Sequence, residues 1–528
     1  MVDNASRKIW DVIVIGTGMG GGPIGRVLAQ AGLSVLFLEK GPMGAPAEEQ
    51  TLDSEVFDPV ARQVRGYWPK PIKAIINGHM SEFFAPIGAA VGGSSVFYAA
   101  TLERPERRDI DSINTMPHPT GGWPVSYDEF LPYFTKTEQM FYVHGQEDPL
   151  YQDGPSNLIQ PPETTPEDKA MKDGFKAKGL HPYHAHMAIK NMPECMQCLG
   201  KKCPHGGKMD GRSAGVMPAL ETGNAEIIDM CEVTALKGEA GSISHIIASR
   251  KGQTLTFRAR CYVLAAGALS SPRLLLASAS DEWPNGCANS SGLVGKNLMF
   301  HLNEMFAVFP KSDSNGPSKA IAMRDLYNDN QDRHGMMQAM GIDASYGEIV
   351  HYLNMMFDRS FLSRLKFLRQ FTRIPAMIAI KIFGRAKIFV GLLEDLPYKE
   401  NRVEFNADKP DEIQVHYRFT PELLQRRRSF RKRIKKAMRG QRSAFIGFQP
   451  ELNFGHACGT VCFGSDPSSS VLDRNCRAHD VDNLYVVDSS FMPTSMGVNP
   501  SLMIAANALR VGDHIIVDLT GKEGQDRD

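Results

Sequence analysis

The sequence predicts an α/β fold in two domains, and three observations support this prediction. The chain has 528 residues, more than one ordinary hydrophobic core accommodates, so two domains with a ligand cleft between them are expected. The β-branched run Asp11–Ile15 leads directly into the glycine-rich turn Gly16–Gly21 and then into a helical stretch, Gly25–Ala31. This is the strand, turn and helix order of a nucleotide site. Similar patterns recur far down the chain, so the nucleotide-binding domain is predicted to be discontinuous.

The first turn has the G-x-G-x-x-G spacing of a Rossmann-like dinucleotide site. Gly16 would permit the tight turn, Gly18 would let a pyrophosphate approach the backbone, and Gly21 would let the helix pack closely on the strand. The helix amino terminus would then face the phosphates. A second strand, Ser34–Leu38, ends at Glu39. An acid in this place suits the ribose hydroxyls of a dinucleotide without a 2′-phosphate.

The choice between NAD and FAD depends on how much of the chain carries nucleotide-type signals. An NAD enzyme usually completes its nucleotide domain within about 150 residues. Here such signals continue to the carboxyl end of the chain. This favours FAD in a discontinuous domain, with an NAD-linked dehydrogenase as the alternative.

Three later segments have the glycines and apolar runs of a ligand-facing core. Gly88–Ser95 is rich in residues that let backbone crowd a ligand. Tyr262–Ala266 is predicted to be a buried strand, and it ends in a turn at Gly267 that starts another helix. Leu484–Val487 is a further predicted strand, which ends at Asp488.

Two polar residues near the carboxyl end suggest proton transfer. His456 lies in the glycine-flanked loop Gly455–Thr460, and Asn499 precedes Pro500 and a predicted helix, Ser501–Val517. A neutral imidazole could accept the proton of an alcohol while a redox cofactor takes the hydride. The amide of Asn499 could orient the hydroxyl and hold the developing alkoxide. A structural histidine and a helix cap are the alternative interpretations.

Five segments in this order resemble the glucose-methanol-choline (GMC) oxidoreductases, which are FAD enzymes that oxidise alcohols. They are the nucleotide turn with Glu39, the Gly92–Ser95 loop, the Gly267–Leu276 segment, His456-x-x-Gly459-Thr460, and Asn499-Pro500. The resemblance implies an α/β protein with a discontinuous Rossmann-like FAD-binding domain plus an α+β substrate domain that contains an antiparallel sheet. The FAD-binding parts would be 8–110, 215–305 and 451–520, the substrate parts 111–214 and 306–450, and the tail 521–528.

The resemblance also implies the residues of the site. The catalytic pair would be His456 and Asn499, an active site of the His/Asn type similar to that of cholesterol and choline oxidases. Asp488 would contact the ribityl or phosphate region of FAD. The cofactor-binding residues would be Gly16, Gly18, Gly21, Glu39, Gly92, Gly93, Ser94, Ser95, Val233, Gly267, Asp488, Asn499 and Pro500.

Three positions depart from the family pattern. Some members attach FAD covalently through a histidine after the paired glycines, where this chain has Phe97, so noncovalent FAD is expected. Tyr98 stands where the family often has Asn, and Cys462 stands where it often has Arg.

The expected function is FAD-dependent oxidation of a primary or secondary alcohol to the carbonyl, with a preference for hydrophobic or sterol-like alcohols. The electron acceptor would be dioxygen or a carrier. A sugar or polyol oxidase or dehydrogenase of the same family is one alternative. A non-redox lyase that contains FAD is another.

Composition and charge argue against a nucleic-acid-binding, exported or membrane-spanning protein. Lys+Arg and Asp+Glu both number 59, so no net field favours nucleic acid. The first ten residues lack the apolar stretch of a signal peptide, and no uncharged apolar run reaches roughly 18 residues. A cytoplasmic protein is therefore expected, in which the nine cysteines are thiols rather than a disulfide framework.

Cys195, Cys198 and Cys203 lie close together and are followed by His205. Their spacing is incomplete for a zinc site or an iron-sulfur cluster. No metal is predicted, and a thiol-bearing or disulfide-clasped loop is the preferred interpretation.

Two stretches are strongly basic. Arg359–Leu393 has eight Lys or Arg, no acids and many large apolar residues. It is predicted either to contact an anionic membrane as an interfacial segment or lid, or to cover the substrate cavity as a helix with a solvated basic side. Arg426–Arg442 has ten cations and is predicted to be a solvated helix face, with docking of an acidic electron acceptor as the alternative.

Overall fold

The first strand lies in the middle of a large, mainly parallel sheet. In the computed structural model, β1 (Ile9–Ile15) pairs in parallel with β2 (Val35–Leu38) and with β8 (Gln253–Leu264). The order of the eight-stranded sheet is β18, β19, β8, β1, β2 and β5, and β6 and β7 extend it from β8. Val12, Ile13 and Val14 have no exposed surface, as a strand covered on both faces requires. The discontinuous nucleotide-type sheet predicted from the sequence is confirmed.

The structure describes residues 2–44, 59–190, 202–203, 205–239, 241–310, 319–329, 332–343, 349–350, 353–354, 356–357, 360–383 and 386–521. Within these ranges, no helix is both long enough and apolar enough to cross a bilayer.

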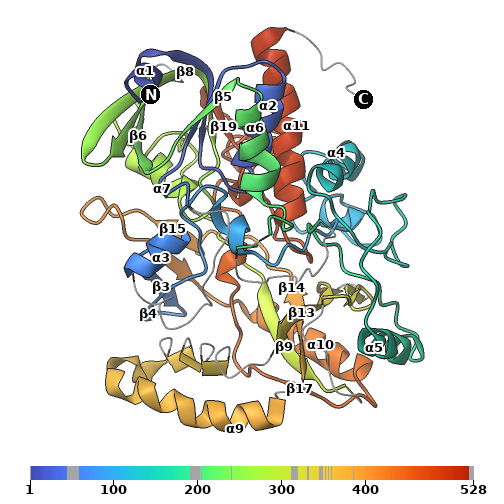
Figure 1. Cartoon of the computed structure of the whole chain (residues 1–528). Coiled ribbons are helices and arrows are strands. Elements are labelled where there is room, and N and C mark those ends of the chain that lie inside the picture. The colour runs from blue at the N-terminus through green and yellow to red at the C-terminus, as the bar shows by residue number, and fades with distance from the viewer. Residues whose placement is uncertain are drawn as a thin grey trace.

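Two helices from opposite ends of the chain lie together beside the large sheet (Figure 1). They are α2 (Gly21–Gln30), which follows the glycine turn, and α11 (Ser501–Thr520). Their close approach depends on Gly512, because a Cβ there would lie 2.6 Å from a methyl carbon of Val27. The helices predicted at both ends of the sequence are thus present and in contact.

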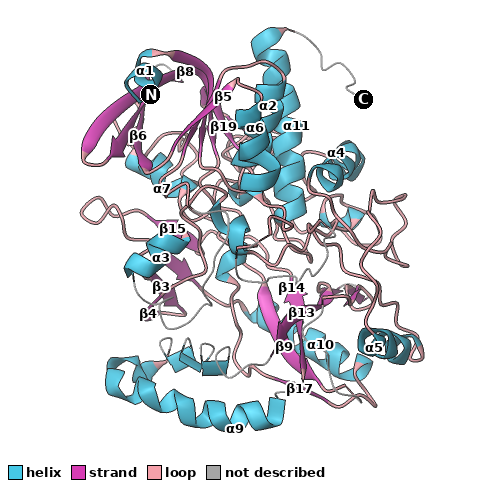
Figure 2. Cartoon of the chain, in the orientation of Figure 1, coloured by secondary structure: helices cyan, strands magenta, loops and turns pink. Residues whose placement is uncertain are grey.

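A separate five-stranded sheet lies in the lower half of the molecule as Figure 2 draws it. Its order is β10, β13, β14, β9 and β17, and every pair is antiparallel. α10 (Pro421–Ala437) packs on it, because a Cβ at Gly391 of β14 would lie 2.6 Å from the Phe430 ring. The predicted antiparallel sheet is therefore confirmed.

A small sheet joins two regions that the sequence assigns to different domains. β16 (Gln414–Tyr417) pairs in parallel with β3 (Ile72–Ile76), and β15 (Arg402–Glu404) and β4 (His79–Phe83) complete the four strands. This sheet and the antiparallel sheet share one hydrophobic core. The predicted FAD-binding part 8–110 and substrate part 306–450 are therefore in direct contact.

The remaining elements have the following bounds. The helices are α1 (Val2–Arg7), α3 (Pro59–Arg65), α4 (Tyr127–Met140), α5 (Pro166–Lys176), α6 (Met217–Glu221) and α7 (Ser271–Ala277), with the short turns η2 (Gly93–Phe97), η3 (Arg107–Asp109), η4 (Gly211–Val216), η7 (Phe454–His456) and η8 (Ser489–Phe491). The strands are β5 (Ala225–Ile228), β6 (Cys231–Glu239), β7 (Ser242–Arg250), β9 (Leu302–Val308), β10 (Ala322–Met323), β11 (Asn328–Asp329), β12 (Asp332–Arg333), β13 (Met337–Asp343), β17 (Ser443–Phe445), β18 (Arg477–Ala478) and β19 (Val481–Val486).

The first basic stretch is two kinds of structure rather than one. Its described part begins with η5 (Phe361–Arg364), η6 (Lys366–Thr372) and α9 (Arg373–Phe383). It ends in the strand β14 (Lys387–Leu393), all of whose residues are buried. The sequence predicts an interfacial segment or covering helix that extends to residue 393. This prediction is wrong for Lys387–Leu393, because these residues form a buried strand of the antiparallel sheet.

The second basic stretch is only partly a solvated face. Arg426 and Arg427 in α10 are buried and form ion pairs with Glu422 and Glu304 respectively. Arg428 and Lys432 are exposed. The expectation of a solvated helix face is thus wrong for the inner side of α10, where the Arg427 guanidinium pairs with the buried carboxylate of Glu304.

Candidate active site

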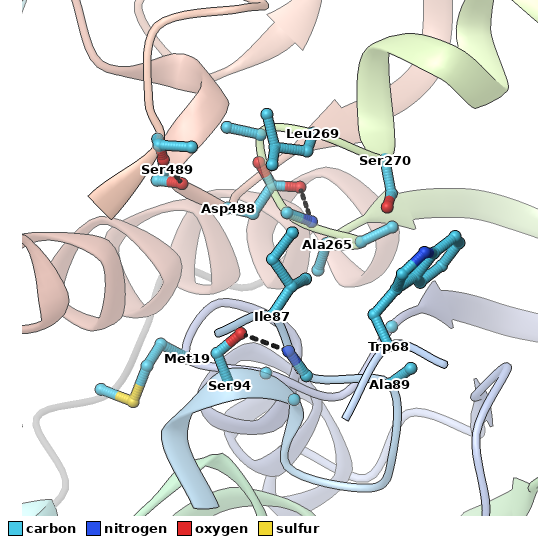
Figure 3. Close-up of a pocket in the computed structure, with 18 of the residues that line it drawn as sticks. Met19, Trp68, Ile87, Ala89, Ser94, Ala265, Leu269, Ser270, Asp488 and Ser489 are labelled. Carbon is cyan, nitrogen blue, oxygen red and sulfur yellow. Dashed lines mark hydrogen bonds between the residues drawn. The ribbon is translucent and has the colours of Figure 1, made fainter. Parts of the chain in front are cut away.

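A cavity of about 540 Å³ extends from the carboxyl ends of β1 and β2 to the loop that carries His456. Ligands of open α/β sheets bind at this edge. Figure 3 shows Trp68, Ile87, Ser94, Leu269 and Asp488 around it. Its lining residues come from 15–20, 38–40, 68, 86–101, 231–234, 265–277, 405–411, 453–457 and 488–504.

The glycine turn leaves space where the sequence predicts a pyrophosphate. Gly16 has φ +95°, and a Cβ there would lie 2.5 Å from the Ala265 carbonyl oxygen, so the turn requires glycine. A Cβ on Gly18 would meet only Gly93 Cα and Gly92 O, at 3.9 and 4.0 Å. Since Gly18 lines the cavity, a larger side chain there would extend into the ligand space.

Glu39 is held in place by two donors. Thr17 Oγ1 donates to Glu39 Oε2 at 2.6 Å, and the Gly41 amide donates to Oε1 at 3.0 Å. Burial raises the pKa of the Glu39 carboxyl, while these two hydrogen bonds and Lys40 oppose the rise. The Gly92 amide donates to the same Thr17 hydroxyl at 3.0 Å. Thr17 therefore connects Glu39 to the second glycine loop, Gly88–Ser95.

The second glycine loop is folded by its own serines. The Gly88 amide donates to Ser94 Oγ at 2.8 Å, as Figure 3 shows. Ser95 Oγ donates to the Gly92 carbonyl at 2.6 Å and accepts from the Gly211 amide at 2.9 Å. Both serines also line the cavity.

The two aromatic residues after this loop have defined partners. The Phe97 ring stacks on Tyr67 with centroids 4.0 Å apart. The Tyr98 hydroxyl donates to the Met209 carbonyl at 2.6 Å. Both Phe97 and Tyr98 line the cavity.

Asp488 ties the end of β19 to the turn after β8. Its Oδ2 accepts from the Gly267 amide at 2.9 Å, visible in Figure 3, and from the Ser271 hydroxyl. Its Oδ1 accepts from the Ser490 amide at 2.9 Å. Burial raises the pKa of Asp488, and these donors oppose the rise. Asp488 lines the cavity, and its contact with a ribityl or phosphate group stays a prediction.

His456 is hydrogen-bonded to a second histidine. The two Nδ1 atoms of His456 and His301 are 3.0 Å apart, and His301 Nε2 is 2.9 Å from the Met496 carbonyl oxygen. His301 is fully buried, and burial lowers its pKa to about 4. Burial is also the largest cause of a His456 pKa well below the ordinary value, followed by His301 and Lys319. Both rings are therefore neutral at pH 7.

The neutral state of both rings determines where their protons lie. The Met496 carbonyl can only accept, so His301 carries its proton on Nε2 and presents a lone pair at Nδ1. His456 must then donate from Nδ1 to His301. This leaves a lone pair on His456 Nε2, for which the described residues provide no hydrogen-bond partner. Since His456 lines the cavity, Nε2 is the nitrogen available to a ligand.

Asn499 has an unused polar atom at the same cavity. The side chain is 7% exposed, and no described residue donates to its buried Oδ1. It precedes Pro500, the N-cap of α11, and both residues line the cavity. A buried acceptor without a donor is costly, which indicates a place for a ligand group.

A buried lysine lies behind the cavity wall. Lys319 is 1% exposed, and its Nζ donates to the Ala99 carbonyl at 3.0 Å and to Thr101 Oγ1 at 2.8 Å. Burial lowers the pKa of Lys319 to about 7. Ala99 and Thr101 both line the cavity, so this lysine supports the wall from the side of the second domain.

Almost all the predicted site residues meet at this cavity. His456, Asn499 and every predicted cofactor residue other than Gly21 and Gly92 line it. Gly21 packs beneath the first turn, since a Cβ there would lie 2.0 Å from the Gly16 carbonyl oxygen. Gly92 has φ +98° and faces Val96 and Arg212 instead. Which of the lining residues contact FAD remains a prediction.

Sequence reasoning did not identify Thr17, His301, Trp68 or Lys319 as site residues. His301 lies 155 residues before His456, and no local pattern connects the two. Thr17 is the one with a usable signal, because it occupies a variable position of the glycine motif directly beside the acid that it orients.

The cysteine cluster falls mainly outside the described part of the chain, since Cys195 and Cys198 lie there. Cys203 is a free thiol, and its Sγ accepts from the Gly207 amide at 3.3 Å. Among the residues that the structure describes, no group of three His, Cys, Asp or Glu side chains is arranged to hold a metal. Cys462 donates its thiol proton to the Gly459 carbonyl at 2.8 Å.

Comparison with known proteins identifies relatives that cover nearly the whole chain. Residues 18–303 and 397–508 match the two family models described as GMC oxidoreductase. The 6'''-hydroxyparomomycin C oxidase of Streptomyces lividus is 27% identical, with 97% of this chain and 93% of the relative aligned. The 2-methyl-1,2-propanediol dehydrogenase of Mycolicibacterium austroafricanum is 26% identical, with 96% and 95% aligned.

The fold also superposes on a solved structure over nearly the whole chain. The crystal structure of pyridoxine 4-oxidase from Mesorbium loti superposes with a TM-score of 0.62 at 18% identity, covering 96% of this chain and 99% of that one. GMC oxidoreductases bind FAD, and the space above Gly18, the buried Glu39 and the unpaired Oδ1 of Asn499 fit such a cofactor. The two family models together match most of the chain, and segments from both ends of the chain line the cavity. This chain therefore belongs to the GMC oxidoreductases and is an oxidoreductase.

Proposed function

We propose that the protein oxidises the CH–OH group of an alcohol to a carbonyl, with His456 as general base and Asn499 as its partner. Bound FAD would supply the hydride acceptor. The observation that supports this proposal is the hydrogen bond between His456 and His301, because it leaves an unprotonated imidazole nitrogen at a cavity suited to the cofactor. An alcohol needs such a base at neutral pH, since its hydroxyl is a weak acid.

The proton of the alcohol would move to His456 Nε2. At pH 7 nearly all molecules hold His456 in the neutral form, because burial keeps its pKa low. His301 accepts the Nδ1 proton and so holds the ring in the tautomer that can act as a base. His301 is therefore a positioning residue in this proposal, and His456 is the catalytic one.

Asn499 would orient the hydroxyl and stabilise the alkoxide. Its side-chain amide has both a donor and an acceptor, and Oδ1 has no partner among the described residues. The free amides at the start of α11, directly after Pro500, point a positive dipole toward the same region. Together they would stabilise negative charge on reduced cofactor or alkoxide.

The remaining proposals concern the cofactor and its location. Gly16, Gly18, Glu39 and the 93–95 loop would hold FAD noncovalently, since Phe97 offers no atom for a covalent bond. Electrons would pass to dioxygen or to a carrier. The enzyme would work in the cytoplasm and at a membrane surface, which the exposed apolar side chains of 360–383 would contact.

Two substrate classes have support. A hydrophobic or sterol-like alcohol is favoured by the apolar segment 360–383, which suits a substrate that partitions into lipid. Polar alcohols are favoured by the relatives, whose names specify 6'''-hydroxyparomomycin C and 2-methyl-1,2-propanediol. A panel containing sterols, long-chain alcohols, diols and amino sugars would distinguish them by anaerobic bleaching of the flavin. If no alcohol in the panel bleaches the flavin, the proposal that this site oxidises alcohols is refuted.

The test of the base is His456→Ala, measured by stopped-flow reduction of the bound flavin without oxygen. FAD should stay bound, while the reduction rate falls at least about 100-fold. Added imidazole should restore part of the rate, because the truncated side chain leaves room for it. His79→Ala is the control, since His79 is an exposed residue of β4. A His456→Ala rate within a few-fold of the unmodified protein would remove His456 from the base role.

A further inference from the structure

An exposed apolar stripe runs along η6 and α9. It consists of Phe367, Phe371, Ile374, Met377 and Ile378, which recur at helical spacing and are 49% to 63% exposed. The spacing of Ile374, Met377 and Ile378 places these three along one side of α9, and Phe367 and Phe371 extend the exposed apolar set along the preceding 3₁₀ helix, η6. A contiguous set of this kind is unusual on a free surface and indicates an interaction site.

The other side of the same segment faces the protein. Ala376 has no exposed surface, and Thr372 Oγ1 donates to Asn354 Oδ1 at 2.8 Å. No member of the apolar stripe belongs to a hydrophobic core formed by the described residues. In Figure 1, α9 lies at the margin of the molecule, below β4 and β17. The stripe therefore points outward because the inner side is already anchored.

The charged residues within 360–383 are all cations. Residues 360–383 contain Arg364, Lys366, Arg369, Arg373 and Lys381 and no acid. An apolar face flanked by cations is suited to bind a surface that is both hydrophobic and anionic. A second copy of this chain is a poor occupant, because pairing the same face would bring two acid-free basic segments together.

We propose that residues 360–383 form an in-plane anchor for an anionic lipid bilayer. The stripe would enter the boundary between headgroups and acyl chains, and the five cations would lie at the level of the lipid phosphates. The anchor does not cross the bilayer, since no described helix is suited to do so. This proposal does not depend on the catalytic role of His456.

The experiment is co-sedimentation of the flavin-loaded protein with vesicles of phosphatidylcholine alone or with phosphatidylserine. Binding should require phosphatidylserine and should weaken as salt is raised. Lys366→Ala with Arg373→Ala should weaken partitioning about 30-fold, as expected for two cations near an anionic surface. Phe371→Ser with Ile378→Ser should weaken it at least about tenfold at both salt concentrations, because the apolar contribution is not screened.

A matched control uses the other basic helix. Arg428→Ala with Lys432→Ala removes the same charge from exposed positions of α10, where no comparable apolar stripe accompanies it, and should leave binding unchanged. Equal loss with this control, or binding that does not depend on phosphatidylserine, would overturn the proposal. A dimer that the Phe371 and Ile378 changes dissociate would also overturn it. Flavin reduction by a water-soluble alcohol should be the same in all these variants, which separates this test from that of the active site.

Discussion

Replacing His301 tests the proposed proton-transfer geometry directly, because its Nδ1 is hydrogen-bonded to the proposed base, His456. In His301→Leu, a residue of similar size occupies the buried position but offers no acceptor. The His456 tautomer with a proton on Nδ1 would then have a buried donor without a partner. That costs about 1–3 kcal/mol, whereas the other tautomer avoids the cost by carrying its proton on Nε2 at the cavity.

The expected effect on rate follows from that cost. A penalty of about 1–3 kcal/mol lowers the fraction of base-competent His456 by roughly 5- to 150-fold. The limiting rate of anaerobic flavin reduction should fall by this factor, while the dissociation constant for the alcohol stays nearly the same. His301→Gln is the matched variant, since its amide can accept from His456 and donate to the Met496 carbonyl. It should recover most of the rate.

Two results with the His301 variants would contradict this mechanism. His301→Leu with the rate of the unmodified protein would mean that the tautomer is not controlled by His301. His301→Gln as slow as His301→Leu would mean that the position matters through packing alone. Flavin content and melting temperature, measured on both variants, separate loss of fold from loss of rate.

Three further predictions concern stability and cofactor binding. Burial lowers the pKa of five histidines to about 4, so the unfolded chain binds protons that the folded chain does not, and stability present above pH 6.5 is lost as pH falls toward 4. Protonation of each of these histidines should lower the free energy of unfolding by about 2 kcal/mol between pH 7 and pH 5. A melting temperature that is the same at pH 5 as at pH 7 would contradict this. Gly18→Val should give folded, colourless protein because its side chain enters the cavity, whereas Gly174→Ala, with nothing within 4 Å of its Cβ, should stay yellow. Denaturation and ultrafiltration should release all of the flavin, and colour retained with the protein would refute noncovalent binding. The five histidines are His118, His144, His184, His301 and His334.

The nucleotide end of the site was predictable because its requirements are local. A strand, a glycine turn and an acid at the end of the next strand are read from about thirty consecutive residues. Gly16 and Glu39 occupy the expected places because each is determined by backbone conformation and by parallel pairing of β1 with β2. The family resemblance added the later segments, whose order no local rule specifies.

The end of the cavity at which we propose proton transfer was predictable only in part. Motif context singled out His456 and Asn499, which both line the cavity, but their environment depends on residues distant in sequence. His301 acquires its role because β9 begins beside the loop of His456, which a hydrophobic pattern cannot reveal. Lys387–Leu393 was misread for a related reason: its basic neighbours suggested an exposed segment, whereas strand pairing with β9 buries it.

The order of strands in the large sheet determines when the complete cavity can form. β8 lies between β1 and β19, so two adjacent ladders join residues near 12, 260 and 485. Contacts of such sequence separation form late and slow folding. Nearly the entire polypeptide must be synthesised before Glu39 and Asn499 can face the same space. A chain that ends before Asn499 should therefore lack the complete cavity.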